Sequence, residues 1–211
     1  IRAVKKLIRE AFDFYKSLDR ALTEITIVSD MSRSQVQELT QEFIKLSAQT
    51  GMAIDDIAQA SVIFFQQGLS TKEVMEMTEV TAQFAKVAGS TVEKAADQLT
   101  AAVNGFQVGV EGAIDVADKL NAVAAKSAAS IDEIATAMSK AASQANQAGL
   151  SMDKFYAILA TMEEVTREAP ENIGTSMKTI MARMQQIKEG NNTEDETDVN
   201  DVETALKTVG I

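Results

Sequence analysis

The chain has 211 residues, enough for one large domain or two small ones, and a formal net charge of -11 at pH 7. It contains no cysteine and no histidine, which excludes disulfides, thiolate zinc sites and Ser-His or Cys-His catalytic dyads. The negative charge argues against nucleic-acid binding, since phosphates are recognised by basic surfaces. No apolar run approaches the ~18 residues that a membrane span needs.

Composition predicts an all-α fold. Aromatic residues make up 5% of the chain, alanine is abundant, and the single proline is Pro170. Long stretches of Ala, Glu, Lys, Leu, Met and Gln without proline favour helix, and alternating strand patterns are nearly absent. The chain begins at Ile1 with no signal-peptide pattern after it. We therefore expect a fragment of a longer protein.

The first predicted element is a long helix over 2–29, within an N-terminal segment 1–33. Its apolar residues follow a heptad spacing of 4, 3, 4, 3, 4, 3, which predicts a seam for another helix. The partner helix could belong to this chain or to a second copy, so the segment is a candidate oligomerising arm. The basic cluster of Arg2, Lys5, Lys6 and Arg9 is more typical of a solvated face than of a phosphate site. The seam consists of Val4, Ile8, Ala11, Tyr15, Leu18, Leu22 and Ile25.

Regular stop and start signals follow this helix. Glycines close helices because they adopt the left-handed conformation without steric cost. Ser-x-x-Glu boxes open them, because the serine oxygen accepts from an early backbone N–H while the glutamate reaches back. Ser151 is a further start, and Ser34 with Gln37 is a weaker box. The predicted stops are Gly51, Gly68, Gly89, Gly105, Gly149 and Gly190, and the predicted boxes are Ser70 with Glu73, Ser90 with Glu93, and Ser130 with Glu133.

These signals predict a compact multi-helix bundle over 34–190. A glycine-rich loop is expected at 105–113, and the acidic stretch 191–200 is expected to be a flexible linker. Residues 201–211 are the start of a further, truncated element. The expected helices lie near 2–29, 34–50, 54–67, 71–88, 91–104, 114–128, 131–148, 152–168, 172–189 and 200–208.

The sequence also contains a weak internal repeat. The sequence AIDDIAQA at 53–60 is similar to SIDEIATA at 130–137, and QQGLSTKE at 66–73 is similar to QAGLSMDK at 147–154. A repeated helix–Gly-Leu-Ser–helix unit is typical of a pseudo-symmetric bundle. The alternative explanation is convergence of capping chemistry, because a leucine after the terminal glycine is common anyway.

No arrangement of residues predicts chemistry. Neighbouring carboxylates on a helix point about 100° apart, so such pairs do not converge as general acid–base catalysis requires. No phosphate-binding loop or EF-hand spacing occurs, and the sequence GVEG at 109–112 lacks the strand that a phosphate loop follows. We predict no catalytic, cofactor-binding or metal-binding residues. The candidates considered are the pairs Asp55–Asp56, Asp132–Glu133 and Glu163–Glu164, and a stripe of Met177, Met181 and Met184 that is more typical of core than of a binding groove.

The ordered set of segments resembles the core region of phage tail tape-measure proteins. FYKSLDRALTEITIVSDMSRSQVQELTQEFIKLSAQTGMAIDDIAQA at 14–60 and FFQQGLSTKEVMEMTEVTAQFAKVAGSTVEKAADQLTAAVNGF at 64–106 carry this resemblance. VADKLNAVAAKSAASIDEIATAM at 116–138, QAGLSMDKFYAILATM at 147–162, GTSMKTIMARM at 174–184 and ALKTVGI at 205–211 continue it. The acidic stretch at 190–200 is longer than expected for the family.

The resemblance implies a structural role in the virion. Such proteins scaffold the tail tube, set its length and assist genome delivery, with tail-tube proteins, tail-tip proteins and tail assembly chaperones as partners. It also implies a location in the tail-tube lumen. The heptad seam, in contrast, is what suggests a homo-oligomer, and the net charge of -11 is what argues against direct nucleic-acid binding by this segment. Any contact with the host membrane would fall to other parts of the parent chain. The alternative is a helical signalling or interaction domain of a bacterial protein, which would need longer uninterrupted heptads than those that end at Ile25.

Overall fold

Nine α-helices and one 3-10 turn make up the described part of the chain. The structure is a computed structural model, and it describes residues 2–188, without the side chains of residues 2–4, 7, 187 and 188. The all-α prediction is confirmed, since no strand occurs among these residues. The elements are α1 (Arg2–Ser29), α2 (Arg33–Thr50), α3 (Ile54–Gln66), α4 (Thr71–Ala88), α5 (Val92–Phe106), η1 (Val110–Gly112), α6 (Ala113–Ala124), α7 (Ile131–Gln147), α8 (Met152–Thr166) and α9 (Pro170–Lys188).

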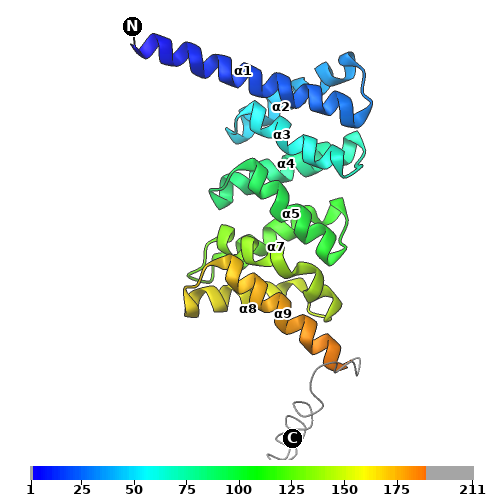
Figure 1. The fold of residues 1–211 in the computed structure, drawn as a ribbon, viewed down its shortest axis with the longest axis vertical. Coiled ribbons are helices and arrows are strands. Elements are labelled where there is room, and N and C mark those ends of the chain that lie inside the picture. The colour runs from blue at the N-terminus through cyan, green and yellow to red at the C-terminus, as the bar shows by residue number, and fades with distance from the viewer. Residues whose placement is uncertain (1, 189–211) are drawn as a thin grey trace, which may run out of the picture.

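The helices form a two-layer stack in chain order (Figure 1). Successive odd-numbered helices pack on one another, α1 on α3, α3 on α5, α5 on α7 and α7 on α9. The even-numbered helices lie beside them, and each contacts the odd-numbered helices before and after it in the chain. The arrangement is elongated, unlike the compact bundle expected, because each helical hairpin buries its apolar face mainly against its immediate neighbours.

Serine caps begin several helices, though two of the predicted boxes are displaced. The boxes at Ser70 and Ser130 are present, with the side chains of Glu73 and Glu133 accepting from the backbone N–H of the cap serine. The prediction for Ser90 is wrong, because the neighbouring Thr91 caps α5. The weaker box also moves by two residues, from Ser34 with Gln37 to Ser32 with Gln35. Ser151 is at the N-cap of α8, but its side chain makes no capping hydrogen bond.

Four of the predicted glycine stops are confirmed by their backbone conformation. Gly51, Gly68, Gly89 and Gly149 all have positive φ angles, between 67° and 79°. Gly105 is a wrong prediction, because α5 continues through it to Phe106, which also shortens the expected loop at 105–113. The C-cap of α5 is the left-handed Gln107. Gly190, the linker 191–200 and the element 201–211 lie outside the described residues.

Two glycines lie directly against α7, one from α5 and one from α9. A Cβ added at Gly105 of α5 would come within 2.5 Å of the Cβ of Ala142. A Cβ added at Gly174 of α9 would meet the backbone carbonyl oxygen of Ala137. Glycine is therefore required at both crossings, because only a bare backbone lets these helices approach α7 so closely.

Only the C-terminal half of α1 belongs to the body of the stack. Ala21 and Ile25 are buried, and α1 packs extensively on α3. Further towards the N-terminus, Ile8 and Tyr15 of the predicted seam are 65% and 68% exposed. Figure 1 shows this half of α1 projecting beyond the other helices. The predicted seam is thus covered by the chain itself only near its end.

The two copies of the sequence repeat occupy matching places. The first match falls at the beginning of α3 and of α7, and the second covers the α3–α4 and α7–α8 turns. In both turns the residue after the glycine donates a helix-closing hydrogen bond to the carbonyl five residues before it, from Leu69 N to Phe64 O at 3.4 Å and from Leu150 N to Ala145 O at 2.9 Å. The two turns therefore share one helix-closing geometry at matching places in the stack.

Candidate functional site

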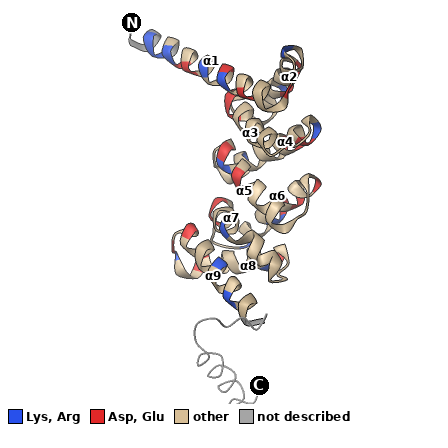
Figure 2. Ribbon diagram, turned by 45° about the vertical axis from the view of Figure 1, so that its right-hand side comes forward, with Lys and Arg blue, Asp and Glu red and all other residues tan. Residues whose placement is uncertain are grey.

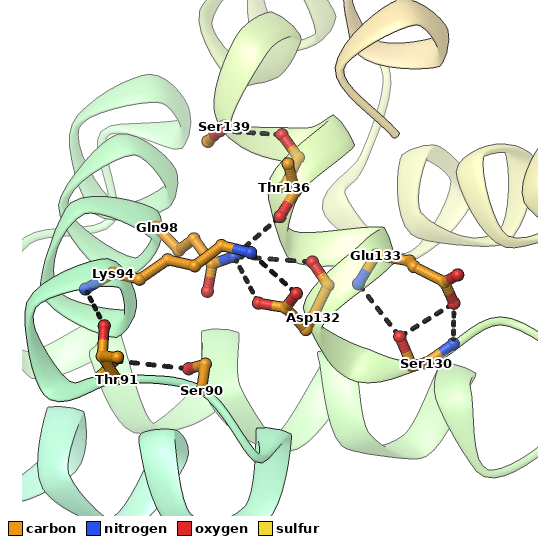
Figure 3. Close-up of polar contacts among 9 residues, drawn as sticks. All are labelled: Ser90, Thr91, Lys94, Gln98, Ser130, Asp132, Glu133, Thr136 and Ser139. Atoms are coloured by element: carbon orange, nitrogen blue, oxygen red, sulfur yellow. Dashed lines mark hydrogen bonds and ion pairs between the residues drawn. The ribbon is translucent and has the colours of Figure 1, made fainter. Parts of the chain in front are cut away.

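A polar network ties α5 to α7 on the side of their crossing where α7 begins (Figure 3). The buried Gln98 donates from Nε2 to Thr136 Oγ1 at 3.0 Å and to Asp132 Oδ1 at 3.2 Å. Lys94 Nζ lies 2.7 Å from the other oxygen of the same carboxylate, Asp132 Oδ2. Because the ion pair is partly solvated, it contributes about 1 kcal/mol at most. The network therefore fixes the register of two helices and does not gather reactive groups.

The carboxylate pair Asp132–Glu133 is divided between two structural tasks. Asp132 faces α5, whereas Glu133 turns back to accept from the backbone N–H and the hydroxyl of Ser130 at 2.7 and 2.8 Å. The hydrogen bond from the Ser130 backbone, followed by that from its hydroxyl, lowers the pKa of Glu133 below its ordinary value. The two carboxylates therefore face different partners and do not converge.

The pair Glu163–Glu164 is also divided, and one member is buried. Glu163 is 4% exposed and its Oε1 has no hydrogen-bond partner, whereas Glu164 is exposed. Burial, followed by repulsion from Glu133 and Glu171, raises the pKa of Glu163 to about 7. It lies within the last turn of α8, where the helix dipole also disfavours a negative charge. Sequence analysis did not single out this environment, because position within α8 alone does not reveal what covers a side chain.

The remaining candidates bring no reactive groups together. Asp55 and Asp56 stand in the first turn of α3, and burial, then Asp55, raises the pKa of Asp56. Among the described residues, no group of three His, Cys, Asp or Glu side chains could hold a metal ion. The sequence GVEG at 109–112 forms the 3-10 turn before α6. Within residues 2–188, no helix has the length and apolar character of a membrane-crossing segment.

The methionine stripe of α9 divides between core and surface. Met177 and Met181 are 8% and 2% exposed and belong to the core, whereas Met184 is 62% exposed. The first two methionines therefore form part of the core, as the sequence favours, whereas Met184 lies beyond the helices that bury them.

The projecting half of α1 has the largest set of uncovered apolar side chains. Ile8, Phe12 and Tyr15 are each at least 65% exposed, and Phe14 is 40% exposed. Figure 2 shows that basic residues gather on the same half of the helix. By helical geometry Lys6 and Arg9 lie on the side of the helix opposite the heptad seam, whereas Lys5 lies on the flank of the seam, one turn from Ile8. This pattern suits a helix–helix interface better than a phosphate site.

Three features of the fold are thus typical of a structural scaffold. Glycines allow close helix crossings at α7, and a polar network beside them fixes the register of α5 and α7. An apolar surface of α1 is exposed at the N-terminal end. Such an arrangement can hold a shape and bind other helices.

Comparison with known proteins relates this chain to a protein family. Residues 40–210 match the family described as phage-related minor tail protein. A probable tape measure protein of Escherichia phage P2 is 23% identical over 180 residues, which are 85% of this chain and 22% of that protein. A tape measure protein of Pneumococcus phage Dp-1 is 21% identical over 163 residues, which are 77% of this chain and 14% of that protein. No solved structure matches the chain.

Proposed function

This chain belongs to the phage-related minor tail protein family and is a structural module of a phage tail, and from this premise we propose that it helps to scaffold the tail tube and to set its length. The proposal includes a place in the tube lumen and a part in genome delivery. The chain spans less than a quarter of the relatives it matches, so these are roles of a longer protein to which the module contributes.

The elongated two-layer stack is the observation that supports this proposal most strongly. A length-setting protein must hold a reproducible extent, and a stack held by neighbour-to-neighbour packing has a length fixed by its number of helices. The glycine crossings at α7 help to fix this length, because Gly105 and Gly174 hold α5 and α9 in close contact with α7. The helical signalling domain considered as an alternative is not favoured by the family match.

We infer that the projecting half of α1 meets another helix in the assembled tail. Its exposed Ile8, Phe12 and Tyr15 gain about 25 cal/mol for each Å² that a partner covers. A second copy of the chain is the partner that the heptad spacing favours, since the same seam is offered by both copies. Tail-tube proteins, tail-tip proteins and assembly chaperones are the further partners proposed for the parent protein.

The role proposed for this module is non-enzymatic and does not include nucleic-acid binding. The net charge of -11 repels phosphates, and the basic residues of α1 are too few to reverse this. Any contact with the host membrane is assigned to other parts of the parent chain.

Changing the length of the module in the parent gene tests the length-setting role. We expect an in-frame deletion of residues 33–188 to shorten the tails measured by electron microscopy. The shortening should be less than the approximately 230 Å that the same residues would span as one continuous helix. A duplication of α3 and α4 should lengthen the tails. This second variant tests the length-setting role even if the deletion prevents tail assembly. Tails of unchanged length with the duplication would refute the proposal.

A further inference from the structure

Two exposed apolar side chains in the middle of the stack line the same hollow. Within residues 54–147, the large apolar side chains that remain exposed are Val87 and Ile114, each 60% exposed. They belong to α4 and α6, which contact one another on the same side of the stack (Figure 2). The hollow between the two helices has a volume of about 130 Å³, and its apolar lining consists of Val80, Phe84, Val87, Ile114 and Ala117.

The hollow is part of a groove between two helix faces. On each side the lining residues are spaced 3, 1 and 3 apart, from 80 to 87 on α4 and from 114 to 121 on α6. Each helix therefore turns one continuous stripe towards the groove. A cavity of roughly 150 Å³ takes up a benzene molecule, so the hollow admits a single phenyl ring. The groove suits an amphipathic helix that inserts one aromatic side chain.

The charged residues at this groove are acidic. Asp118 lines the hollow, and Glu111 lies about one turn before Ile114. Both carboxylates are exposed, and neither forms an ion pair with another of the described side chains. The lining itself includes neither Lys nor Arg. Charge complementarity therefore favours a helix whose apolar stripe is bordered by basic residues.

The projecting half of α1 is a helix of this kind. Its exposed apolar stripe consists of Ile8, Phe12 and Tyr15. Lys5, one turn before Ile8, and Lys16, one turn after Phe12, border this stripe. Both lysines are exposed and have no ion-pair partner among the described side chains.

The dimensions of α1 and its place in the stack also fit this groove. Residues 5–16 extend roughly 18 Å, the same length as the 12 residues of α6. The C-terminal half of α1 is held on α3, and its projecting half points away from α4 and α6 of the same chain (Figure 1). The projecting half therefore reaches the groove of another copy and not its own.

We propose that the projecting half of α1 docks in the α4–α6 groove of a second copy, with Phe12 in the hollow and its lysines beside the groove carboxylates. This inference rests on the proposed contact of α1 with a second copy, and it names the surface that receives the helix. A parallel pair of α1 seams, in contrast, brings the same lysines of both copies to the same level, where equal charges repel. Because the docking helix and the receiving groove are different surfaces, each copy binds the next, and the contact repeats in chains or rings.

Self-association of the whole chain, measured by analytical ultracentrifugation, tests the groove. Ile114→Asp should raise the dissociation constant about tenfold or more, because it places a charge on an apolar wall. Val165→Asp is the matched control, since Val165 is 76% exposed on α8 and lies outside the groove, and it should leave the constant unchanged. Both positions are exposed, so the fold persists in both variants, which circular dichroism checks. Equal effects of the two substitutions would overturn the proposal.

A third variant separates this failure from that of the underlying contact. Phe12→Asp should also weaken self-association, because it removes the side chain that enters the hollow. If Phe12→Asp abolishes self-association and Ile114→Asp has no effect, α1 contacts the second copy at another surface, and the groove is excluded. If Phe12→Asp has no effect either, the proposed contact of α1 with a second copy fails as well.

Photo-cross-linking locates the contact without a loss of binding. Benzoylphenylalanine in place of Tyr15 lies one turn from Phe12 on the same face and leaves Phe12 intact. Its cross-links between copies, mapped by mass spectrometry, should fall mainly in residues 80–87 and 114–121. The same group in place of Asp13, on the opposite side of α1, should not reach them. Cross-links mainly to the α1 helix of the second copy would show that the seams pair with each other and would overturn the proposal.

Discussion

The helices α7 and α1 both present an apolar face, but they differ in the size of the side chains on that face and in what covers it. The buried face of α7 is rich in alanine, including Ala137, Ala141 and Ala142, and both α5 and α9 pack closely on it. The projecting half of α1 carries larger side chains, such as Phe12 and Tyr15, without cover from this chain. Small residues therefore mark the closely packed centre of the stack, and large exposed ones mark the surface for which we propose contact with other molecules.

The largest expected effect comes from filling the α7–α9 crossing. Gly174→Val should destabilise the chain by about 3 kcal/mol or more, because the new side chain would meet the Ala137 carbonyl of a backbone that cannot move away easily. Thermal or urea denaturation measures the loss. Thr175→Val is the matched control, since Thr175 is the exposed neighbour in the same helix and its substitution should change stability by about 0.5 kcal/mol or less. Equal losses for the two variants would mean that α9 does not approach α7 closely.

A buried carboxylate should make the same end of the stack sensitive to pH. The pKa of Glu163 is raised in the folded chain from 4.5 to about 7, so its contribution to stability is greatest below pH 4.5 and is lost as pH rises through 7. Glu163→Gln removes the charge and should stabilise the chain at pH 8 by up to about 3 kcal/mol.

The test of this effect is urea denaturation of both proteins at pH 5 and pH 8. The advantage of Glu163→Gln should grow between the two values, because only the original side chain becomes charged. Glu164→Gln is the matched control, as Glu164 is the exposed neighbour. An advantage that is equal at both pH values would contradict the burial of Glu163.

The smallest of these effects concerns the cap of α7. Ser130→Ala should cost about 1 kcal/mol, because it removes the hydroxyl that accepts from Glu133 N at 3.2 Å. Ser90→Ala should cost much less, since Thr91 and not Ser90 caps α5. Denaturation midpoints of the two single variants make the comparison, and a larger loss for Ser90→Ala would place the start of α5 where sequence analysis put it.

Local chemistry accounts for the features that could be predicted from the sequence. The boxes at Ser70 and Ser130 and the stop at Gly89 depend on residues within one turn of each other, so their pattern is visible along the chain. The prediction of a helix stop at Gly105 is wrong because a glycine at a helix crossing and a glycine at a helix end look alike in sequence. Only the partner helix, thirty or more residues away, distinguishes them.

Packing between distant segments also explains which features of the candidate sites could not be predicted from the sequence. The heptad spacing of α1 does not show that other helices cover its apolar residues only from about Ala21 onwards and leave Ile8 exposed. Likewise, Glu163 and Glu164 are equivalent in sequence, and only the approach of α7 and α9 to one side of α8 separates them. The extent of burial is a property of packing between distant segments.

Hydrogen–deuterium exchange across the whole chain at two protein concentrations tests the contrast between α7 and α1 most directly. We predict that amides in residues 134–145 of α7 exchange most slowly at both concentrations, since they open only when the stack unfolds. Amides in residues 5–15 of α1 should exchange quickly in dilute solution and more slowly at high concentration, as copies cover the exposed seam. The account is contradicted if residues 134–145 exchange as fast as residues 5–15, because α7 would then not be the rigid centre of the stack.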